Sequence, residues 1–360
     1  MPTSSEKLAP SPAPTDAKFR LVIHGGAGTM DKSRATPELR KQYKAALRHA
    51  LLAGYAVLSA GGEAMDAAVA AVSSMEDCPL FNAGKGAVFN VGGKNELEAS
   101  LMLSKPPASH PHIPPERRGS RVRSTSRPTP PRTPCSPGSR EDLGKPLGIK
   151  LVDPSYYFTE NRWREHRRGL GLPEEPLPHA ETHDFAWDAD LPLEENANKQ
   201  VPDALLPNPK GTVGAVALDV RGCIAAVTST GGRTNKLVGR VGDTPSMGCG
   251  FWVEEWEVDG WARKIWRRMR GGEAPWPWYF IRLATGATIG RRMKYLNEPL
   301  DVAAKACVEE LRRDGGVGGI IAMDNTGNIT MPLNCSGMYR GFVLEDGTPK
   351  TAIFDDDELN

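Results

Sequence analysis

Thr212 occupies a position at which its hydroxyl could act as a nucleophile. It follows Gly211, at the point where a Pro-rich stretch gives way to the strongly apolar segment TVGAVALD. A threonine hydroxyl is a poor nucleophile unless a base lies beside it, and a free α-amino group on the same residue is such a base. Cleavage of the chain between Gly211 and Thr212 would create that group. Threonine at the start of a strand is also ordinary β propensity, so this pair alone decides nothing.

A second candidate feature is the Gly-rich segment VGRVGD, which places Arg240 and Asp243 three residues apart. A planar guanidinium can grip a carboxylate through two parallel hydrogen bonds, and a carboxylate attracts an ammonium group. The pair could therefore hold both charges of an amino-acid zwitterion. Without further context, a surface ion pair is the simpler interpretation.

The commoner catalytic motifs are absent from the sequence. It contains no GxxxxGK(S/T), HExxH or GxSxG pattern and no His/Cys cluster with metal-ligand spacing. This argues against the usual nucleotide, zinc and serine-hydrolase sites. His24, before Gly25 and Gly26, could act as a base, but a structural histidine at a strand end is the favoured interpretation.

Composition argues against several kinds of partner. The 45 Lys and Arg residues nearly balance the 44 Asp and Glu residues, so no global field attracts nucleic acid or an acidic membrane surface. The N-terminal residues contain no apolar run long enough for a signal peptide, no run anywhere is long enough for a membrane span, and the six cysteines are spread singly. We expect a cytoplasmic protein without membrane or nucleic-acid partners, and a disordered leader over residues 1–18.

Apolar periodicity predicts helices first and paired strands later. Residues 19–28, FRLVIHGGAG, read as a buried strand ending in a turn; Thr36 caps a helix that runs to two glycines, and residues 63–75 form another. After Gly211, TVGAVALD with CIAAVTST and GGIIAMD with ITMPLN form two hairpins, with a helix over residues 301–313 between them. This order predicts an α+β fold in which helices cover a stacked pair of sheets.

Three segments differ from the rest in composition. Residues 105–140 carry ten prolines and seven arginines, so no core can form there, and a solvated loop is favoured over a nucleic-acid arm because no aromatic residue is interleaved for base stacking. Residues 254–278 place tryptophans among Arg and Lys, a poor pattern for a central strand and one that could suit a binding surface. Residues 173–210 read as an acidic, Pro-rich linker.

Five motifs, in order, resemble the plant-type asparaginases, the isoaspartyl peptidase and asparaginase family of N-terminal nucleophile hydrolases. The motifs are HGGAG at 24–28, MEDCPLFNAGKGAVFN at 75–90, GTVGAVALD at 211–219, TSTGGRTNKLVGRVGDTP at 228–245 and GGVGGIIAMDNTGNI at 315–329. The resemblance implies a four-layer αββα sandwich made as a precursor that cleaves itself between Gly211 and Thr212.

The same resemblance implies how the chain is organised. Residues 19–211 would be the α-subunit part of one domain, with 105–140 as an irregular insert and 173–210 as a linker. Residues 212–360 would be the β-subunit part of the same domain, with 254–278 atypical. Two autocleaved (αβ) units would pair as a homodimer, and no cofactor would be required.

The resemblance also assigns roles to single residues. Thr212 would attack the side-chain amide or β-peptide carbonyl of a small substrate, asparagine or an isoaspartyl dipeptide. Thr230 would hydrogen-bond near the nucleophile, Arg240 would grip the substrate α-carboxylate and Asp243 the α-ammonium. Asn82, in the FNAG segment, would approach the nucleophile, the alternative being a simple Asx turn. A structural sodium ion would be held by the backbone carbonyls of Met75, Glu76, Cys78, Phe81, Ala83 and Lys85.

The chain departs from the family at one catalytic position. Relatives place a Thr-Gly doublet, which forms the oxyanion hole, just before the segment that reads YFIRLATGATIG here. The doublet would fall near Ala274 and Pro275, and proline has no amide to donate; Thr285 and Gly286 come later and belong to the next helix.

Three alternatives follow: an active amidohydrolase, a catalytically impaired or unprocessed homologue, and a basic binding module. The abrupt edges of both inserts also suggest retained intron or shifted-frame sequence.

Overall fold

The computed structural model describes residues 18–28, 30–108, 111–112, 119–125, 152–176, 211–258, 261–271 and 278–360. These residues form helices together with two antiparallel sheets, which confirms the predicted α+β class. The predicted leader lies outside the described residues apart from Lys18, and most of the predicted linker lies outside them too. In the described part of the chain, no helix is long and apolar enough to cross a membrane.

The larger sheet has seven strands in the order β11-β10-β1-β4-β5-β2-β3, all paired antiparallel. Its strands are β1 (Arg20–Gly28), β2 (Glu96–Leu103), β3 (Gly119–Thr125), β4 (Val213–Leu218), β5 (Ile224–Thr230), β10 (Gly337–Val343) and β11 (Lys350–Phe354). The central four, β1-β4-β5-β2, come from both sides of the Gly211–Thr212 bond. Ladder hydrogen bonds would therefore hold the two parts together if that bond were cut.

Two predicted features of this sheet compare directly with the structure. The β4–β5 hairpin is confirmed, with Leu218 opposite Ile224 at its closed end. The strand predicted over residues 19–28 is also confirmed, but it continues through its glycines to Gly28 and does not end in a turn. Its register with β10 shifts between His24 and Gly26, where a glycine with φ 130° absorbs the irregularity.

The smaller sheet has four strands in the order β6-β7-β8-β9. They are β6 (Phe251–Val258), β7 (Trp261–Gly271), β8 (Gly318–Asp324) and β9 (Ile329–Thr330). The predicted second hairpin is confirmed as β8–β9. The Trp/Arg-rich segment 254–278 was predicted to be a poor central strand, and this is wrong for β7, which pairs with both β6 and β8. The backbone ladder outweighs the segment's weak side-chain pattern.

The insert over residues 105–140 also departs from its prediction as a solvated loop. Gly119–Thr125 forms β3, which pairs with β2 along seven residues at the edge of the larger sheet. An edge strand needs only one paired side, so a segment without an apolar pattern can still add to a sheet there. The rest of the insert is described only at residues 105–108 and 111–112.

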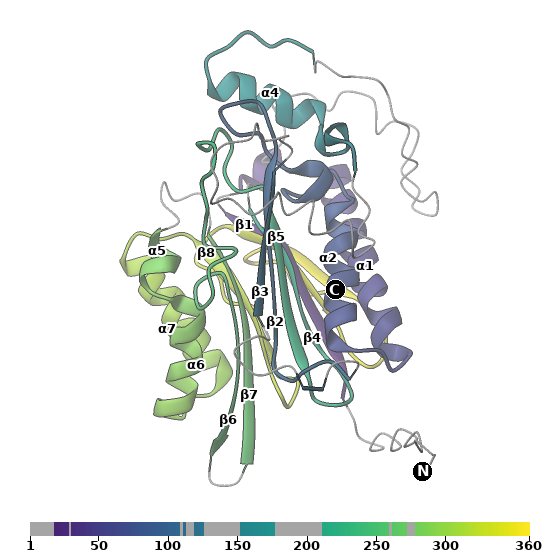
Figure 1. Cartoon of the computed structure of the whole chain (residues 1–360), viewed down its shortest axis with the longest axis vertical. Coiled ribbons are helices and arrows are strands. Elements are labelled where there is room, and N and C mark those ends of the chain that lie inside the picture. Colours follow the sequence, from purple (N-terminus) through teal and green to yellow (C-terminus); the bar gives the residue numbers. More distant parts are fainter. Residues whose placement is uncertain are drawn as a thin grey trace, which may run out of the picture.

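Helices cover the sheets as the sequence order predicts. The six α-helices of the described chain are α1 (Pro37–Ser59), α2 (Ala64–Glu76), α4 (Glu160–Gly169), α5 (Trp278–Arg282), α6 (Thr285–Leu296) and α7 (Leu300–Arg313). Helix α1 begins as predicted, because the Thr36 hydroxyl accepts the Leu39 amide at 3.2 Å. Figure 1 shows α1 and α2 along the larger sheet, α6 and α7 beside the smaller one, and α4 at one end of the molecule.

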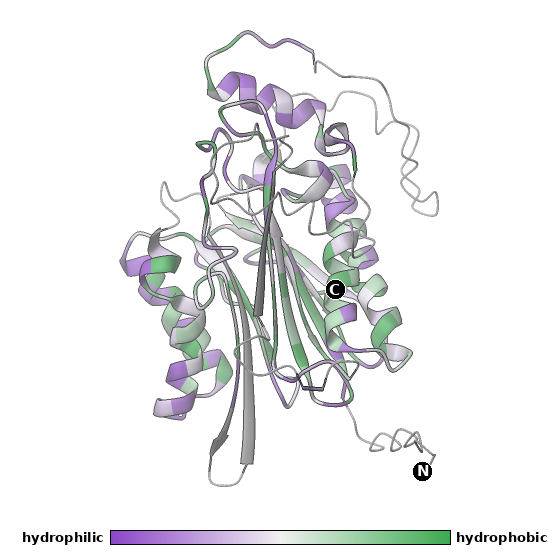
Figure 2. Cartoon of the chain, viewed as in Figure 1, coloured by the Kyte–Doolittle hydropathy of each residue, from purple (hydrophilic) through white to green (hydrophobic). Residues whose placement is uncertain are grey.

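Three buried clusters hold these elements together. The first joins α1 and α2 to the larger sheet and includes Leu21 of β1. The second contains Val22 of β1 together with Ile321 of β8, so it contains residues of both sheets. The third joins α6 and α7 to β8 through Ile320. Since Leu21 and Val22 are neighbours that enter different clusters, β1 is covered on both faces, and Figure 2 shows its sheet as mainly hydrophobic.

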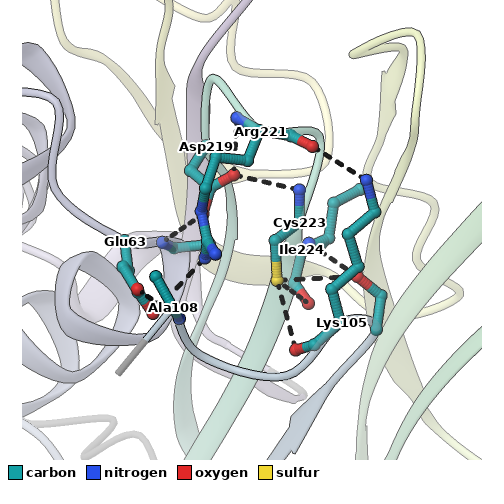
Figure 3. A network of polar contacts seen from close by, with 9 residues as sticks. Glu63, Lys105, Ala108, Asp219, Arg221, Cys223 and Ile224 are labelled. Carbon is teal, nitrogen blue, oxygen red and sulfur yellow. Dashed lines mark hydrogen bonds and ion pairs between the residues drawn. The ribbon is translucent and has the colours of Figure 1, made fainter. Parts of the chain in front are cut away.

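A polar network fixes the end of the larger sheet where β4 turns into β5 (Figure 3). The buried Asp219 carboxylate accepts the backbone amides of Ala64, Arg221 and Cys223 at 3.1, 2.9 and 2.9 Å. The Arg221 guanidinium bridges Asp219 and Glu63. Asp219 thereby satisfies an amide at the N-terminus of α2 and ties that helix to the hairpin.

Candidate active site

Thr212 directly precedes β4, in the middle of the larger sheet. Gly211 and Thr212 are both buried, and Thr212 is only 5% exposed. Its Oγ1 lies 2.7 Å from the Oγ1 of Thr244. Buried polar groups need hydrogen-bond partners, and this partner comes from the loop that follows Arg240.

Thr230 ends β5 on the neighbouring strand. Val213 pairs with Ser229, so the same register continued by one residue sets Thr212 opposite Thr230. The Thr230 Oγ1 accepts the amide of Gly232 at 3.0 Å. The structure thus brings the two predicted threonines to adjacent strand ends, with the Thr230 hydroxyl bonded to its own loop.

Asn82 joins the FNAG segment to that loop. Its Nδ2 donates to the Gly232 carbonyl at 2.8 Å, and its backbone carbonyl accepts the Gly231 amide at 2.9 Å. Its Oδ1 accepts the Val88 amide at 3.1 Å. A simple Asx turn therefore does not describe Asn82, because its fully buried side chain connects segments about 150 residues apart.

Arg240 lies over the same loop. A Cβ atom built on Gly232, which has φ 75°, would lie 3.3 Å from Arg240 Nη1 and 3.1 Å from Lys236 Nζ. The guanidinium therefore lies beside Gly232, two residues after Thr230 in the chain. Asp243, three residues after Arg240, is 7% exposed, so the pair is not an exposed surface ion pair.

Two carboxylates of β2 hold the loop that carries Arg240. Glu98 accepts the Gly242 amide at 3.0 and 3.2 Å through its two oxygens, and Glu96 accepts the Gly239 amide at 3.1 and 3.2 Å. Both glutamates are at most 4% exposed. These bonds bracket Arg240 on either side and fix the loop to the sheet.

Burial sets the electrostatics of this region. Desolvation raises the pKa of Glu98, and the nearby charges of Lys236 and Arg240 and the bond from Gly242 oppose it. Desolvation also lowers the pKa of Arg240, against the attraction of Glu98 and Asp243. The loop therefore keeps a cation and carboxylates in a partly dry environment, where a bound zwitterion would feel them strongly.

Sequence reasoning missed three of these residues: Thr244, Glu98 and Lys236. Lys236 is buried and its Nζ donates to the carbonyls of Glu96 and Gly231, the latter at 2.8 Å. A signal existed for Glu98, because ELEASLML places Glu96, Glu98 and Ser100 at strand spacing on one face. Thr244 lies in irregular chain, where no periodic pattern could identify it.

The predicted sodium ligands span the end of α2 and a following 3-10 turn. The carbonyls of Cys78 and Ala83 each accept one backbone amide, at 3.3 and 3.1 Å, and the Met75 carbonyl accepts the amides of Cys78, at 3.3 Å, and Asp77. The Cys78 and Ala83 carbonyls each have a second lone pair, and carbonyl oxygens are the hard donors that suit such a cation. Burial raises the pKa of the Cys78 thiol to about 12, so the sulfur stays protonated. Among the described residues, no His, Cys, Asp and Glu cluster could hold a metal.

Four further predictions concern positions outside this loop. Thr285 and Gly286 begin α6, where Gly286 packs against the Gly248 carbonyl, so their assignment to the next helix is confirmed. Ala274 and Pro275, the predicted place of the missing oxyanion doublet, lie outside the described residues. His24 pairs with Gly214 of β4 and Arg340 of β10 inside the sheet, consistent with a structural histidine. Trp256 is buried in the α6–α7 cluster and does not form an exposed binding surface.

An α+β fold with a buried threonine at a strand start, beside an Arg/Asp loop, has the features of an enzyme that acts on a small amino acid. A family model described as "Asparaginase" matches residues 17–107, 136–258 and 278–353. Between these matches it leaves residues 108–135 and 259–277 unmatched, and they fall within two of the three segments of atypical composition, 105–140 and 254–278. The chain belongs to this asparaginase family.

Similar proteins agree with the family match. The isoaspartyl peptidases of Salmonella typhimurium and Escherichia coli are each 33% identical to the chain. These alignments cover 94% of this chain and 99% and 96% of the relatives. An isoaspartyl peptidase/L-asparaginase of Danio rerio is 31% identical, covering 85% of this chain and 86% of its own.

Proposed function

We propose that the protein is a threonine-nucleophile amidohydrolase that cleaves itself between Gly211 and Thr212. Its substrates are L-asparagine, β-aspartyl (isoaspartyl) dipeptides, or both, and its product is aspartate. One observation carries the proposal: the buried Thr212 hydroxyl lies at the start of β4, next to the end of β5, from which the loop bearing Arg240 leaves. The names of the relatives support the substrate class.

Self-cleavage would need no group beyond the chain and water. The Thr212 Oγ1 attacks the Gly211 carbonyl carbon, the carbon–nitrogen bond breaks, and the hydroxyl proton ends on the released nitrogen. Water then hydrolyses the ester between Gly211 and Thr212. The products are a carboxylate at Gly211 and a free α-amino group on Thr212.

Turnover repeats this chemistry on the substrate. The α-amino group takes the Thr212 proton while Oγ1 attacks the side-chain carbonyl, and ammonia or a peptide amine leaves. Water releases aspartate from the acyl-enzyme. Arg240 would bind the substrate α-carboxylate and Asp243 the α-ammonium, which fixes the carbonyl relative to Oγ1. Thr230 and Asn82 would support the loop between the nucleophile and Arg240.

The finer architecture belongs to the same proposal. We assign the fold to the four-layer αββα type of the N-terminal nucleophile hydrolases, because separate clusters join helices to each sheet and the sheets to one another. Residues 19–211 and 212–360 would be its two parts, and two cleaved units would form a homodimer in the cytoplasm. No cofactor is required, and a structural sodium ion would be bound by the carbonyls of the 75–85 segment.

One observation favours a second candidate, a homologue that is impaired or unprocessed. The sequence has Ala274 and Pro275 where a Thr-Gly doublet is expected. Removal of one oxyanion donor typically lowers the rate by about 10² to 10³. The loss of two would leave little activity.

Product release tests the two candidates. Purified protein is incubated with L-asparagine or a β-aspartyl dipeptide, and ammonia and aspartate are measured, with Thr212→Ala as the matched control. The amidohydrolase predicts aspartate from the native protein and none from the variant. Equal background release from both proteins would favour the impaired homologue.

A further inference from the structure

We propose that Thr244 is a catalytic residue whose hydroxyl orients the Thr212 nucleophile. The inference rests on the proposed function of Thr212 and adds a residue to it. The two Oγ1 atoms lie 2.7 Å apart, a normal hydroxyl–hydroxyl hydrogen bond. Thr212 is 5% exposed and Thr244 1% exposed, so water competes little for this bond.

The backbone of Thr244 is fixed from two other strands. Its carbonyl accepts the Ser100 hydroxyl of β2 at 3.1 Å and the Thr228 hydroxyl of β5 at 3.4 Å. Ser100 and Thr228 also bond to one another. With Thr212 at the start of β4, hydroxyls from three adjacent strands converge on this one residue.

The opposite side of Thr244 is closed by Gly250. A Cβ atom there would overlap the Asp243 carbonyl and lie 2.7 Å from Thr244 Cα. Only glycine leaves room for this approach, so the chain at residues 243–244 is held between the larger sheet and the start of β6. Thr244 therefore presents its hydroxyl at a fixed position.

Thr230, the threonine assigned by resemblance, has a different partner in this structure. Its hydroxyl accepts the Gly232 amide, whereas the hydroxyl bonded to Thr212 belongs to Thr244. The two threonines therefore have different roles: Thr230 stabilises the loop next to Arg240, and Thr244 positions the nucleophile.

The chemistry fits an orienting role better than a basic one. A threonine hydroxyl is too weak a base to remove the Thr212 proton. As a hydrogen-bond partner it fixes the position of the Thr212 Oγ1 and leaves an oxygen lone pair directed at the carbonyl carbon. During self-cleavage the proton still ends on the Thr212 nitrogen as the Gly211 carbon–nitrogen bond breaks. Because catalysis falls steeply when reacting atoms are misplaced by about 1 Å, loss of this bond should be costly.

The test compares variants of the full-length chain made by cell-free translation, so that uncleaved precursor can be followed on a denaturing gel. Thr244→Val removes the hydroxyl with little change of shape, and Thr244→Ser keeps it. Thr351→Val is the matched control: Thr351 is equally buried and bonded to the Asn360 carbonyl, but lies in β11, three strands from β4. We expect self-cleavage about 10- to 100-fold slower in Thr244→Val, near-native in Thr244→Ser and native in Thr351→Val.

Cleaved protein supplies a second measurement. In Thr244→Val kcat should fall while KM stays unchanged, because the variant leaves the substrate-binding charges in place. If the valine variant shows no cooperative melting transition, Thr244→Ala replaces it. Alanine removes the hydroxyl and, unlike valine, puts no methyl group in the position of the hydroxyl.

Each outcome decides one point. Native cleavage by Thr244→Val, or failure of serine to restore cleavage, would overturn the role of the Thr244 hydroxyl while the function of Thr212 stands. A native chain that never cleaves would overturn both the inference and the self-cleavage on which it rests.

Discussion

At the scale of single residues, substrate binding depends on the planar guanidinium of Arg240. We predict that Arg240→Lys raises KM for L-asparagine about thirty-fold, because an ammonium cannot form two parallel bonds to a carboxylate and a charged hydrogen bond contributes about 2 kcal/mol. Steady-state kinetics measure this. Arg312→Lys, in an exposed ion pair with Glu309 on α7, is the matched control and should leave KM unchanged. An unchanged KM in Arg240→Lys would remove Arg240 from the substrate site.

Glu98 gives a prediction about pH. Burial raises its pKa in the folded protein above the value of about 4.5 in the unfolded chain, so the folded state holds its proton longer as pH rises. The free energy of unfolding should therefore fall as pH rises from about 4.5 through the raised pKa. Glu98→Gln cannot titrate and should lose this part of the pH dependence. Urea unfolding of both proteins at a series of pH values checks it, and identical pH slopes would contradict it.

At the scale of elements, the loop after β5 must bend tightly under Arg240. Gly232→Ala should raise KM and lower stability, because a Cβ at φ 75° is strained and also meets Lys236 and Arg240. Gly61→Ala separates the two effects: Gly61 has φ 77° with nothing within 4 Å of an added Cβ. It should cost about 1 kcal/mol of stability and leave KM unchanged. Kinetics and urea unfolding of both variants measure this, and equal KM values would show that Gly232 does not support Arg240.

The elements that could be predicted are those whose apolar residues recur at a regular helix or strand spacing. Helices α1, α2 and α7 and the hairpins β4–β5 and β8–β9 follow from apolar spacing, caps and turn residues. Strand β2 escaped prediction because Glu96, Glu98 and Ser100 occupy buried positions where apolar residues are expected. Those polar side chains are buried because they bond to the Arg240 loop and to Thr244. The strand therefore lacks the apolar alternation by which a half-buried strand is predicted. Strand β7 could not be anticipated because backbone pairing with β6 and β8 determines it.

The site was predictable only in part. The resemblance predicts Thr212, Thr230, Arg240, Asp243 and Asn82 as site residues, and in the structure they lie near the start of β4 and the end of β5 or in the loops beside them. The contact between Thr212 and Thr244 depends on the path of an irregular loop, which no local sequence pattern specifies. The partners of Asn82 lie about 150 residues away and are fixed only by the folded chain.

At the scale of the whole molecule, two segments separate this chain from its family. The family model leaves residues 108–135 and 259–277 unmatched, although each segment region contributes a strand, β3 or β7. The hypothesis of retained intron or shifted-frame sequence predicts a transcript that lacks these segments or reads them in another frame. Sequencing the transcript tests it, and a message that reads straight through both segments would contradict it.

Self-cleavage between Gly211 and Thr212 is the step on which the proposed nucleophile depends. Because strands from both sides of this bond pair within one sheet, the two pieces should stay associated after the bond is cut, so they must be separated by denaturation. The measurement is the mass of the purified protein under denaturing conditions, with Thr212→Ala in parallel. We expect pieces of 211 and 149 residues from the 360-residue chain, and one intact chain from the variant. An intact native chain, or cleavage that persists in Thr212→Ala, would contradict it.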